Sequence, residues 1–275
     1  MPGCKVQVLA GFIDYCEVDR RLNHKTAVNH KRRIERILEF CGAGNGGGVS
    51  TASIRAFLRT LNVGHANNFV KSLRVYFRDY MKQGYLVDTF RIVQADASPP
   101  RLFTKAELRA FYLALGFPAE RALFLLYATS GRRRLEILNL RLPDLDLANL
   151  VIMPNSQSQT KHTWYSFFNR ECAGALSEYF KMRADRFGTG RVFILPSYKR
   201  DRLFAGARQK TGLKITPRVL RFWFANEMAR LGVQDRFIDA FQGRVPRKVL
   251  ARHYTDYSME TLKRIYDTAG LKVLE

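Results

Sequence analysis

A short segment in the first half of the chain separates two regions with different sequence patterns. Residues 94–100, Gln-Ala-Asp-Ala-Ser-Pro-Pro, are small, polar and rich in proline, a composition typical of an exposed linker. With 275 residues, the chain is long enough for two domains of ordinary size. We therefore predict one domain over residues 1–93, a linker over 94–101 and a second domain over 102–275.

Before the linker, apolar residues recur at helical spacing in four places, and charged residues occupy the other faces. Asn23 is a plausible N-cap for the second helix, and Gly84 follows the last one as a stop signal. The pattern predicts a four-helix domain with basic outer faces. The expected helices cover residues 5–18, 23–41, a short stretch after Ser50 or Thr51, and 66–83.

After the linker, helix signals alternate with short apolar runs that favour strands. Thr104 and Glu107 form a capping-box pattern, Pro118 suits a first helical turn, and Thr216 precedes a further proline. The fold class expected is mainly α with a small antiparallel β-sheet, in which a helical N-terminal domain precedes an α+β domain. Strand-like runs lie at 148–153, 163–168 and 192–195, and a helix is expected over 171–187.

The chain is strongly basic, with 46 Lys and Arg against 24 Asp and Glu and a formal net charge of +22. This excess favours a polyanionic partner, either nucleic acid or an anionic membrane surface. Both expected domains carry it: residues 1–97 hold 15 basic and 8 acidic residues, and the remainder holds 31 and 16. Because the charge is spread over two domains, and no run approaches ~18 apolar residues, a membrane role is the weakest option.

Several common sites are not indicated by the sequence. The four cysteines are scattered without a CxxC pair, so neither a zinc site nor a disulfide framework is expected. The glycines of 42–48 follow an expected helix and lie outside any βαβ unit, which favours a connector over a dinucleotide site. No P-loop pattern occurs. The composition and the lack of a signal-peptide pattern fit an intracellular, reduced protein.

The stretch from Thr216 to Tyr257 carries the residues that indicate chemistry. Arg218 and Arg221 are three apart and would share one face of a helix, Arg244 follows a glycine, and Tyr254 lies in a basic segment. Guanidinium groups bind phosphate oxygens bidentately, and a phenol can act as a nucleophile. This combination favours chemistry on a phosphodiester.

Together with Arg133 and Lys161, these residues make the chain resemble the tyrosine recombinase (phage-type integrase) superfamily, and within it the integrases of archaeal viruses and plasmids. The family motif T-G-x-R-x-x-E-[IL]-x-x-L is similar to residues 130–140, Ser-Gly-Arg-Arg-Arg-Leu-Glu-Ile-Leu-Asn-Leu, which puts the family arginine at Arg133. The family's hairpin lysine falls on Lys161. Its H-x-x-R motif appears as residues 218–221, L-G-[HW] as 242–244, and the nucleophile as Tyr254.

Two positions depart from the family pattern. Arg218 stands where a histidine is usual, and Arg244 replaces the usual His or Trp. An arginine stays protonated near neutral pH, so Arg218 cannot be a general base, although it can stabilise charge on a phosphate. We interpret the two arginines as variation within an active family. His162 and His253 are alternative proton carriers, but an ordinary surface or packing role is the commoner one for such histidines.

The resemblance implies a site-specific recombinase or integrase that cleaves and rejoins DNA through a 3′-phosphotyrosyl intermediate, for integration or excision of a mobile element or resolution of DNA dimers. Tyr254 would be the nucleophile, Lys161 the acid for the leaving oxygen, and the arginines the ligands of the phosphate. No cofactor and no metal are expected. DNA reading is expected on the second and fourth N-terminal helices, near Lys31, Arg32, Lys71 and Arg74.

The same resemblance implies double-stranded DNA attachment sites as partners and a homotetramer on synapsed DNA, and it leaves open a monomer in free solution. The expected location is cytoplasmic and nucleoid-associated. A C-terminal helix over 259–274 would either contact another subunit or pack onto its own domain, with neither favoured. Tyr257 competes with Tyr254 as nucleophile. The alternatives for the whole chain are a type IB topoisomerase-like enzyme and a non-catalytic DNA-binding regulator.

Overall fold

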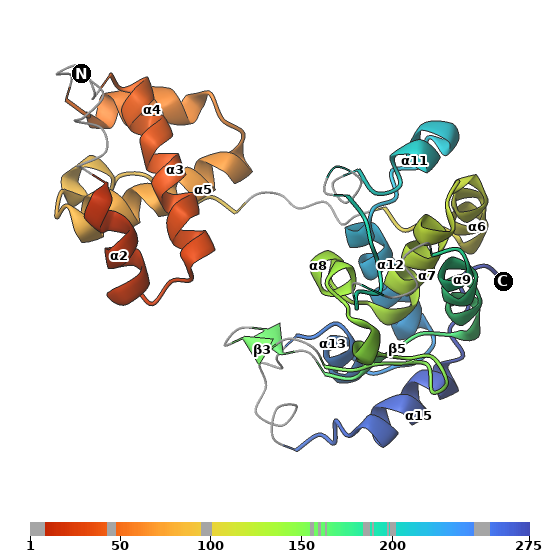
Figure 1. Cartoon of the computed structure of the whole chain (residues 1–275). Coiled ribbons are helices and arrows are strands. Elements are labelled where there is room, and N and C mark those ends of the chain that lie inside the picture. The colour runs from red at the N-terminus through yellow and green to blue at the C-terminus, as the bar shows by residue number, and fades with distance from the viewer. Residues whose placement is uncertain are drawn as a thin grey trace. The chain divides into compact units, whose positions relative to one another are not determined.

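The computed structural model consists of two compact units, Met1–Ser98 and Pro99–Glu275 (Figure 1). The division falls inside the segment 94–101 that the sequence predicts as a linker. Each unit has its own hydrophobic core and is described here by itself. The structure describes residues 9–42, 48–94, 101–154, 157–158, 161–162, 164–183, 188, 190–196, 198, 202–244 and 254–275.

The N-terminal unit is helical, as the sequence predicts. Asn23 caps the second helix by accepting a hydrogen bond from the backbone N–H of Thr26, and Ser50 forms a capping box with Ser53. Leu9, Phe12, Ile34 and Phe57 belong to its core. The elements are α2 (Ala10–Val18), α3 (His24–Phe40), α4 (Thr51–Arg59), α5 (Val63–Leu73), a π-helical segment η1 (Arg74–Tyr80) and a 3₁₀ turn η2 (Gly84–Leu86).

Two helix boundaries in this unit differ from the prediction. Helix α2 begins at Ala10, later than residue 5, and Val6 of its expected stripe lies outside the described residues. Helix α5 begins at Val63, earlier than residue 66, because the side chain of Asn62 caps it through the N–H of His65. The expected fourth helix is therefore an α-helix continued by wider turns, and both parts supply core residues.

The larger unit is organised around one helix that is buried over most of its length. Every residue from Ala122 to Ser130 of α7 is buried, and α7 packs against α9 and α12 (Figure 1). The Thr104–Glu107 capping box and the helical starts at Pro118 and Thr216 are confirmed. The helices are α6 (Lys105–Ala114), α7 (Pro118–Ser130), α8 (Arg134–Leu138), the 3₁₀ turn η3 (Leu142–Asp144), α9 (Arg170–Lys181), α11 (Ala205–Thr211), α12 (Pro217–Arg230), α13 (Asp235–Phe241) and α15 (Met259–Ala269).

A small antiparallel sheet accompanies these helices. Its three strands lie in the order β1 (Leu145–Asp146), β2 (Val151–Ile152), β5 (Ser166–Phe167), with Asp146 and Phe167 both opposite Val151. A separate two-stranded hairpin joins β3 (Gln157–Ser158) to β4 (Lys161–His162). Strand β5 contacts α7, α13 and α15. The predicted class, mainly α with a small antiparallel sheet, is confirmed.

Three predicted elements of this unit are wrong in extent or kind. Residues 192–195 form no strand: Val192 and Phe193 are buried in an irregular segment whose only bridge joins Arg191 to Arg141 in the described ranges. Helix α9 ends at Lys181, before residue 187, and Arg183 turns its Nη1 onto the carbonyls of Arg191 and Val192. Helix α15 ends at Ala269 because Gly270 adopts a left-handed conformation with φ of 60°.

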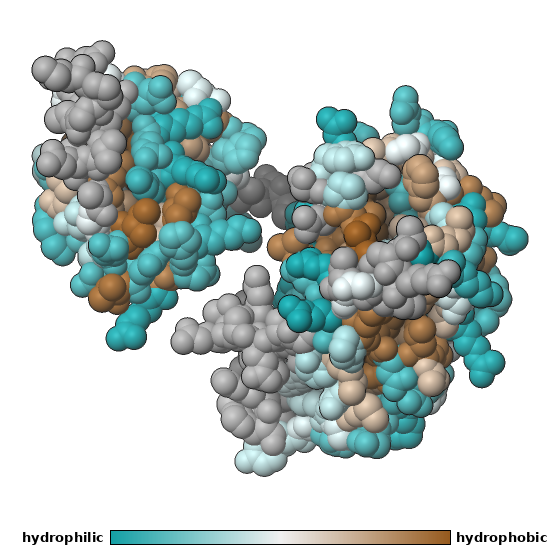
Figure 2. All heavy atoms as spheres, in the orientation of Figure 1, coloured by the Kyte–Doolittle hydropathy of each residue, from teal (hydrophilic) through white to brown (hydrophobic). Residues whose placement is uncertain are grey.

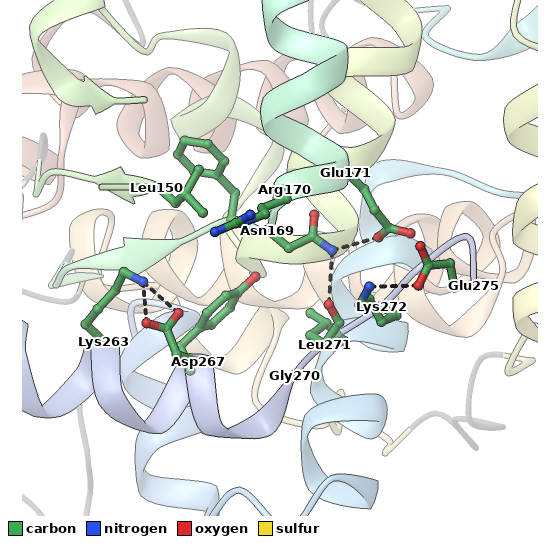
Figure 3. Close-up of a pocket in the computed structure, with 12 residues that line it drawn as sticks. Leu150, Asn169, Arg170, Glu171, Lys263, Asp267, Gly270, Leu271, Lys272 and Glu275 are labelled. Atoms are coloured by element: carbon green, nitrogen blue, oxygen red, sulfur yellow. Dashed lines mark hydrogen bonds and ion pairs between the residues drawn. The ribbon is translucent and has the colours of Figure 1, made fainter. Parts of the chain in front are cut away.

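The tail after α15 packs onto the start of α9 (Figure 3). Asn169 donates to the carbonyl of Leu271, and the Glu171 carboxylate accepts from the N–H groups of Val273 and Leu274. A cavity of about 650 Å³ lies between these elements. In this chain the C-terminal helix and tail pack onto their own unit, which is one of the two alternatives that the sequence left open. The cavity contains none of the residues predicted to form the site.

The visible face of each unit is mainly hydrophilic, and hydrophobic residues gather on part of the larger unit's face (Figure 2). None of the helices in the described ranges combines the length and the hydrophobicity that crossing a membrane requires.

Candidate active site

Residues 129–133, which we call the arginine loop, run from the end of α7 to the N-cap of α8 and are held by hydrogen bonds from three other elements. The carbonyl of Thr129 accepts from Tyr266 Oη on α15 at 2.9 Å, and that of Ser130 accepts from Ser166 Oγ on β5 at 2.7 Å. The carbonyl of Gly131 accepts from Arg221 Nη1 on α12 at 2.9 Å. Three successive carbonyls thus bind three elements, which fixes the backbone at this point.

Gly131 allows the loop to turn at the end of α7. Its φ of +64° lies in the left-handed region that favours glycine. A Cβ at this position would lie 2.4 Å from a ring carbon of Phe224, which is fully buried on α12. The glycine is therefore required both by its conformation and by the close approach of α12.

Arg133, the predicted family arginine, is the N-cap residue of α8, and its side chain is 28% exposed. Its backbone N–H and its Nη1 both bind the carboxylate of Glu136, at 3.0 and 2.7 Å. Its Nη2 donates to the carbonyl of Gly243 at 2.9 Å. A guanidinium has five N–H donors, so these contacts fix the group and leave further donors for a ligand.

Arg221, the second family arginine, is tied to the same region by a reciprocal pair of bonds. Its Nη2 donates to the carbonyl of Gln242 at 2.8 Å, and Gln242 Nε2 donates back to the carbonyl of Arg221 at 2.8 Å. Gln242 is completely buried at the end of α13. Arg133 and Arg221 are therefore anchored to the consecutive carbonyls of Gly243 and Gln242, which brings the two predicted arginines to one place.

The site is electropositive. Burial, together with the guanidinium groups of Arg133, Arg244 and Arg132, lowers the pKa of Arg221 to about 10, although the carboxylate of Glu136 acts in the opposite direction. At neutral pH the group still carries its charge. Cations gathered with few acidic partners favour an anionic ligand such as a phosphate. Within the described ranges, no cluster of His, Cys, Asp or Glu side chains is arranged to hold a metal ion.

The two arginines that depart from the family pattern lie at the margin of this group. Arg218 is exposed in the first turn of α12, one helical turn before Arg221, and its side chain makes no hydrogen bond or ion pair with another described residue. Arg244 is 53% exposed and forms an ion pair of 2.9 Å with Asp239. Neither side chain is fixed as firmly as those of Arg133 and Arg221.

Lys161 lies on β4 of the short hairpin, where its backbone pairs with Ser158. His162 follows on the same strand. His253, the other histidine considered, lies outside the described residues.

The two candidate nucleophiles differ in their surroundings. Tyr254 is 78% exposed, and its side chain makes no hydrogen bond or ring contact with another described residue. Tyr257 is half-buried, with its ring 4.3 Å from that of Trp164 and 6.3 Å from that of Phe237, and burial raises the pKa of its phenol. The structure records no contact between Tyr254 and the arginines.

The residues predicted to read DNA lie on the N-terminal unit, and they differ in exposure. Arg32 and Lys71 are exposed on α3 and α5, and Lys31 faces Glu35 at 3.8 Å. Arg74 is half-buried and donates from Nη2 to the carbonyl of Phe90 at 2.6 Å. The guanidinium of Arg74 thus holds a part of its own unit.

Three residues of the site had no role in the sequence prediction, although all were quoted in its motifs. Glu136 holds Arg133, Gln242 holds Arg221, and Arg132 is 1% exposed with its Nη2 donating to the carbonyl of Trp164. A glutamate at the third position of a helix can accept from the backbone N–H of the N-cap residue, so the spacing of Arg133 and Glu136 could have indicated their contact. No local pattern indicates the burial of Gln242 or Arg132, which depends on tertiary packing.

Comparison with known proteins places this architecture in a family. The model of the family described as archaeal phage integrase matches residues 112–269. Tyrosine recombinase XerA of Thermococcus kodakarensis is 24% identical, with 96% of each chain covered.

Solved integrase structures share the fold. A lambda integrase tetramer bound to a Holliday junction matches with a TM-score of 0.68 at 18% identity, covering 91% of this chain and 76% of that one. The Tn1549 transposon integrase bound to circular intermediate DNA matches with a TM-score of 0.67 at 18% identity, covering 94% and 97%. Neither a type IB topoisomerase-like enzyme nor a non-catalytic regulator is favoured by these comparisons. The chain belongs to the archaeal phage integrase family and is a tyrosine-type site-specific DNA recombinase.

Proposed function

We propose that this recombinase joins and separates a mobile element and its host DNA by cutting strands with Tyr254 at a phosphate held by Arg133 and Arg221. Arg218 and Arg244 are additional phosphate ligands in this proposal, and Lys161 is the acid. The same chemistry can also resolve DNA dimers. The DNA sequence of the attachment site decides which of these reactions the protein performs.

One observation supports this proposal above the others. The guanidinium groups of Arg133 and Arg221 are anchored to the consecutive carbonyls of Gly243 and Gln242, at 2.9 and 2.8 Å. Donors that are fixed before the substrate arrives stabilise developing charge without reorganisation during the reaction. Two such groups at one place suit the non-bridging oxygens of a phosphodiester, whose charge grows as the phosphorus becomes five-coordinate.

The proposed cleavage exchanges one phosphate ester for another. The Oη of Tyr254, which is exposed to solvent, forms a bond to phosphorus and gives its proton to water, and the bond from phosphorus to the 5′-oxygen breaks. Lys161 gives a proton to the departing 5′-oxygen, so that a free 5′-hydroxyl and a 3′-phosphotyrosyl link result. A 5′-hydroxyl from a partner duplex then attacks this link and releases Tyr254. The phosphate ester is conserved, so the exchange consumes no nucleotide triphosphate.

Double-stranded attachment sites are the proposed partners, and a homotetramer on two synapsed sites is the proposed assembly. The DNA in the Tn1549 integrase structure and the tetramer on a Holliday junction in the lambda integrase structure support this assignment. A substrate of chromosomal and element DNA also implies action inside the cell, at the nucleoid. The C-terminal tail, which packs onto its own unit, is a candidate contact between subunits only if it is released.

The N-terminal unit is the proposed DNA clamp. Lys31, Arg32 and Lys71 are the side chains that we assign to DNA contacts, and Arg74 contributes through the backbone that it holds. Because most contacts would be made to phosphates, the affinity for DNA should fall steeply as the salt concentration rises. An affinity that is independent of salt would contradict this assignment.

A nicked suicide substrate tests the whole proposal. Cleavage next to the nick releases a short oligonucleotide, which removes the 5′-hydroxyl that would reverse the reaction and leaves the protein covalently attached. We expect a covalent adduct on DNA that contains the attachment site, and peptide mapping should locate it at Tyr254. An adduct at Tyr257, or none on any candidate site, would reject the assigned mechanism.

A further inference from the structure

We infer that Arg132 is a positioning residue that links the arginine loop both to the Lys161 hairpin and to the segment that carries Tyr254. The inference rests on the proposed function of those two residues. It concerns a side chain that lies beside the proposed phosphate ligands and does not touch the substrate.

Arg132 is unusual because it is a buried cation with few partners. Its side chain is 1% exposed, and its one hydrogen bond to a described residue runs from Nη2 to the carbonyl of Trp164. Its Nε and Nη1 are buried without a hydrogen-bond partner in the described part of the chain. Burying a charge with unpaired donors is costly, and an apolar side chain of similar volume would avoid that cost. A cation at this point therefore needs a reason other than stability.

The hydrogen bond from Arg132 to the carbonyl of Trp164 gives such a reason, because it connects the arginine loop to the hairpin. Trp164 follows β4 by two positions and precedes β5, so its carbonyl lies in the segment that connects Lys161 to the sheet. Two residues further on, Ser166 Oγ binds the carbonyl of Ser130 at 2.7 Å. The strand that leaves the hairpin is thus attached twice to the arginine loop, once through Arg132 and once through Ser166.

The ring of Trp164 extends the same link to the nucleophile. It meets the ring of Tyr257 edge-on at 4.3 Å, and the ring of Phe237 lies 6.3 Å from that of Tyr257. Tyr257 lies three residues after Tyr254, and an edge-on aromatic pair has a preferred geometry. A continuous path of contacts therefore runs from Arg132 through Trp164 to Tyr257, and it reaches a point close to Tyr254 in sequence.

The path predicts that loss of the Arg132 bond displaces both the acid and the nucleophile while the phosphate ligands stay in place. Displacements of about 1 Å near a reacting centre can reduce a rate about 100-fold. The affinity for DNA should change little, because Arg132 is buried and Arg133 and Arg221 keep their own anchors.

The experiment uses the full chain and measures single-turnover cleavage of the suicide substrate by the Arg132→Met variant. We expect cleavage about 100-fold slower than in the unmodified protein, a dissociation constant for DNA within about threefold, and a melting temperature that is unchanged or higher. Arg132→Lys, which keeps a donor for the carbonyl of Trp164, should recover part of the rate. If the unmodified protein itself forms no adduct, that result rejects the proposed function and not only the role of Arg132.

A substrate with a sulfur leaving group distinguishes an effect of Arg132 on Lys161 from an effect on Tyr254. When the bridging 5′-oxygen is replaced by sulfur, the departing thiolate needs no proton, since thiols have a pKa of about 8.5. If Arg132 positions Lys161, the Arg132→Met defect should be smaller on the sulfur substrate, and the remaining defect reports the displacement of Tyr254. An equal defect on both substrates would remove the hairpin from the inference.

Two further variants keep the inference open to rejection. Leu176→Ala removes a fully buried side chain on α9 that is not part of the path, and gives the effect of lost stability alone. Cleavage by Arg132→Met that is as fast as cleavage by the unmodified protein, or no slower than by Leu176→Ala, would overturn the inference. If Arg132→Met does not fold, Trp164→Leu tests the same path: it should slow cleavage, and Trp164→Phe, which keeps a ring, should slow it less.

Discussion

The arginine loop and the segment that begins at Tyr254 are built in opposite ways. The carbonyls of Thr129, Ser130 and Gly131 each accept a hydrogen bond from a different element, and Gly131 is closed in by Phe224. Tyr254, in contrast, is 78% exposed and makes no side-chain hydrogen bond to another described residue. The proposed phosphate site is assembled in the free protein, whereas the side chain of the proposed nucleophile has no hydrogen-bond partner among the residues that the structure describes.

This difference indicates how the phosphate ligands and the nucleophile would each contribute to the proposed reaction. Fixed guanidinium groups stabilise charge without reorganisation, so rigidity serves the phosphate site. The Tyr254 side chain, in contrast, is exposed, and no hydrogen bond to another described residue fixes its hydroxyl. The half-buried Tyr257, three residues away, packs its ring against that of Trp164.

Removal of the Tyr254 hydroxyl should have the largest effect. Tyr254→Phe should form no covalent adduct on the suicide substrate, because the atom that bonds to phosphorus is missing. Tyr257→Phe is the matched control, since it removes the same group three residues away and keeps the ring that packs on Trp164. It should keep adduct formation. The reverse result would show that the exposed residue is not the nucleophile and would break the comparison.

Replacement of an anchored arginine should come next. Arg221→Lys removes the fork that binds the carbonyls of Gly131 and Gln242, and cleavage should be about 10²–10³-fold slower. The exposed Arg218 lies one turn away on the same helix, and Arg218→Lys should slow cleavage about tenfold or less, because its charge is kept and it has no anchor to lose. Equal effects in single-turnover assays would mean that anchoring does not matter.

Local patterns in the sequence predicted the parts of the fold that local interactions decide. Asn23, Thr104 and Thr216 cap helices as expected, because a cap depends on residues within one turn. Residues 192–195 have the composition of a strand, but Val192 and Phe193, the buried members, pack in an irregular segment without a neighbouring strand in the described ranges. The predicted end of α15 at residue 274 was wrong, although Gly270, which directly follows its last residue, is a local stop signal that could have indicated it.

In the candidate site, too, the sequence predicted only the residues that belong to motifs. Arg133 and Arg221 belong to motifs and were found by resemblance, and the structure brings them to one place. Arg132 stands in a run of three arginines, and nothing in that run tells which guanidinium is buried. Its burial depends on Trp164, which is 32 residues away in the chain, so only the tertiary structure distinguishes it from its neighbours.

Distortion of the arginine loop should reduce stability to a moderate extent. Gly131→Ala carries the left-handed conformational cost of about 1 kcal/mol and a clash of the new Cβ with Phe224, for which overpacking costs about 1–3 kcal/mol. Gly212→Ala is the matched control: its φ is +69°, but nothing lies within 4 Å of the new Cβ, so it should cost only the first amount. Urea unfolding measures both. Equal losses would show that the close approach of α12 is easily relieved.

The smallest effect is expected for Arg244, which is held by an exposed ion pair and not by a backbone carbonyl. Arg244 is 53% exposed and bound to Asp239 at 2.9 Å, and such pairs contribute about 0.2–1 kcal/mol in solvent. Asp239→Asn should release Arg244 for a phosphate and strengthen DNA binding by about two- to fivefold at low salt, with the gain lost as salt rises. Asp267→Asn, which breaks the pair with Lys263 on α15, removes the same charge away from the arginines. If both variants bind DNA equally tightly in a titration, the gain comes from net charge alone, and Arg244 takes no part in holding the phosphate.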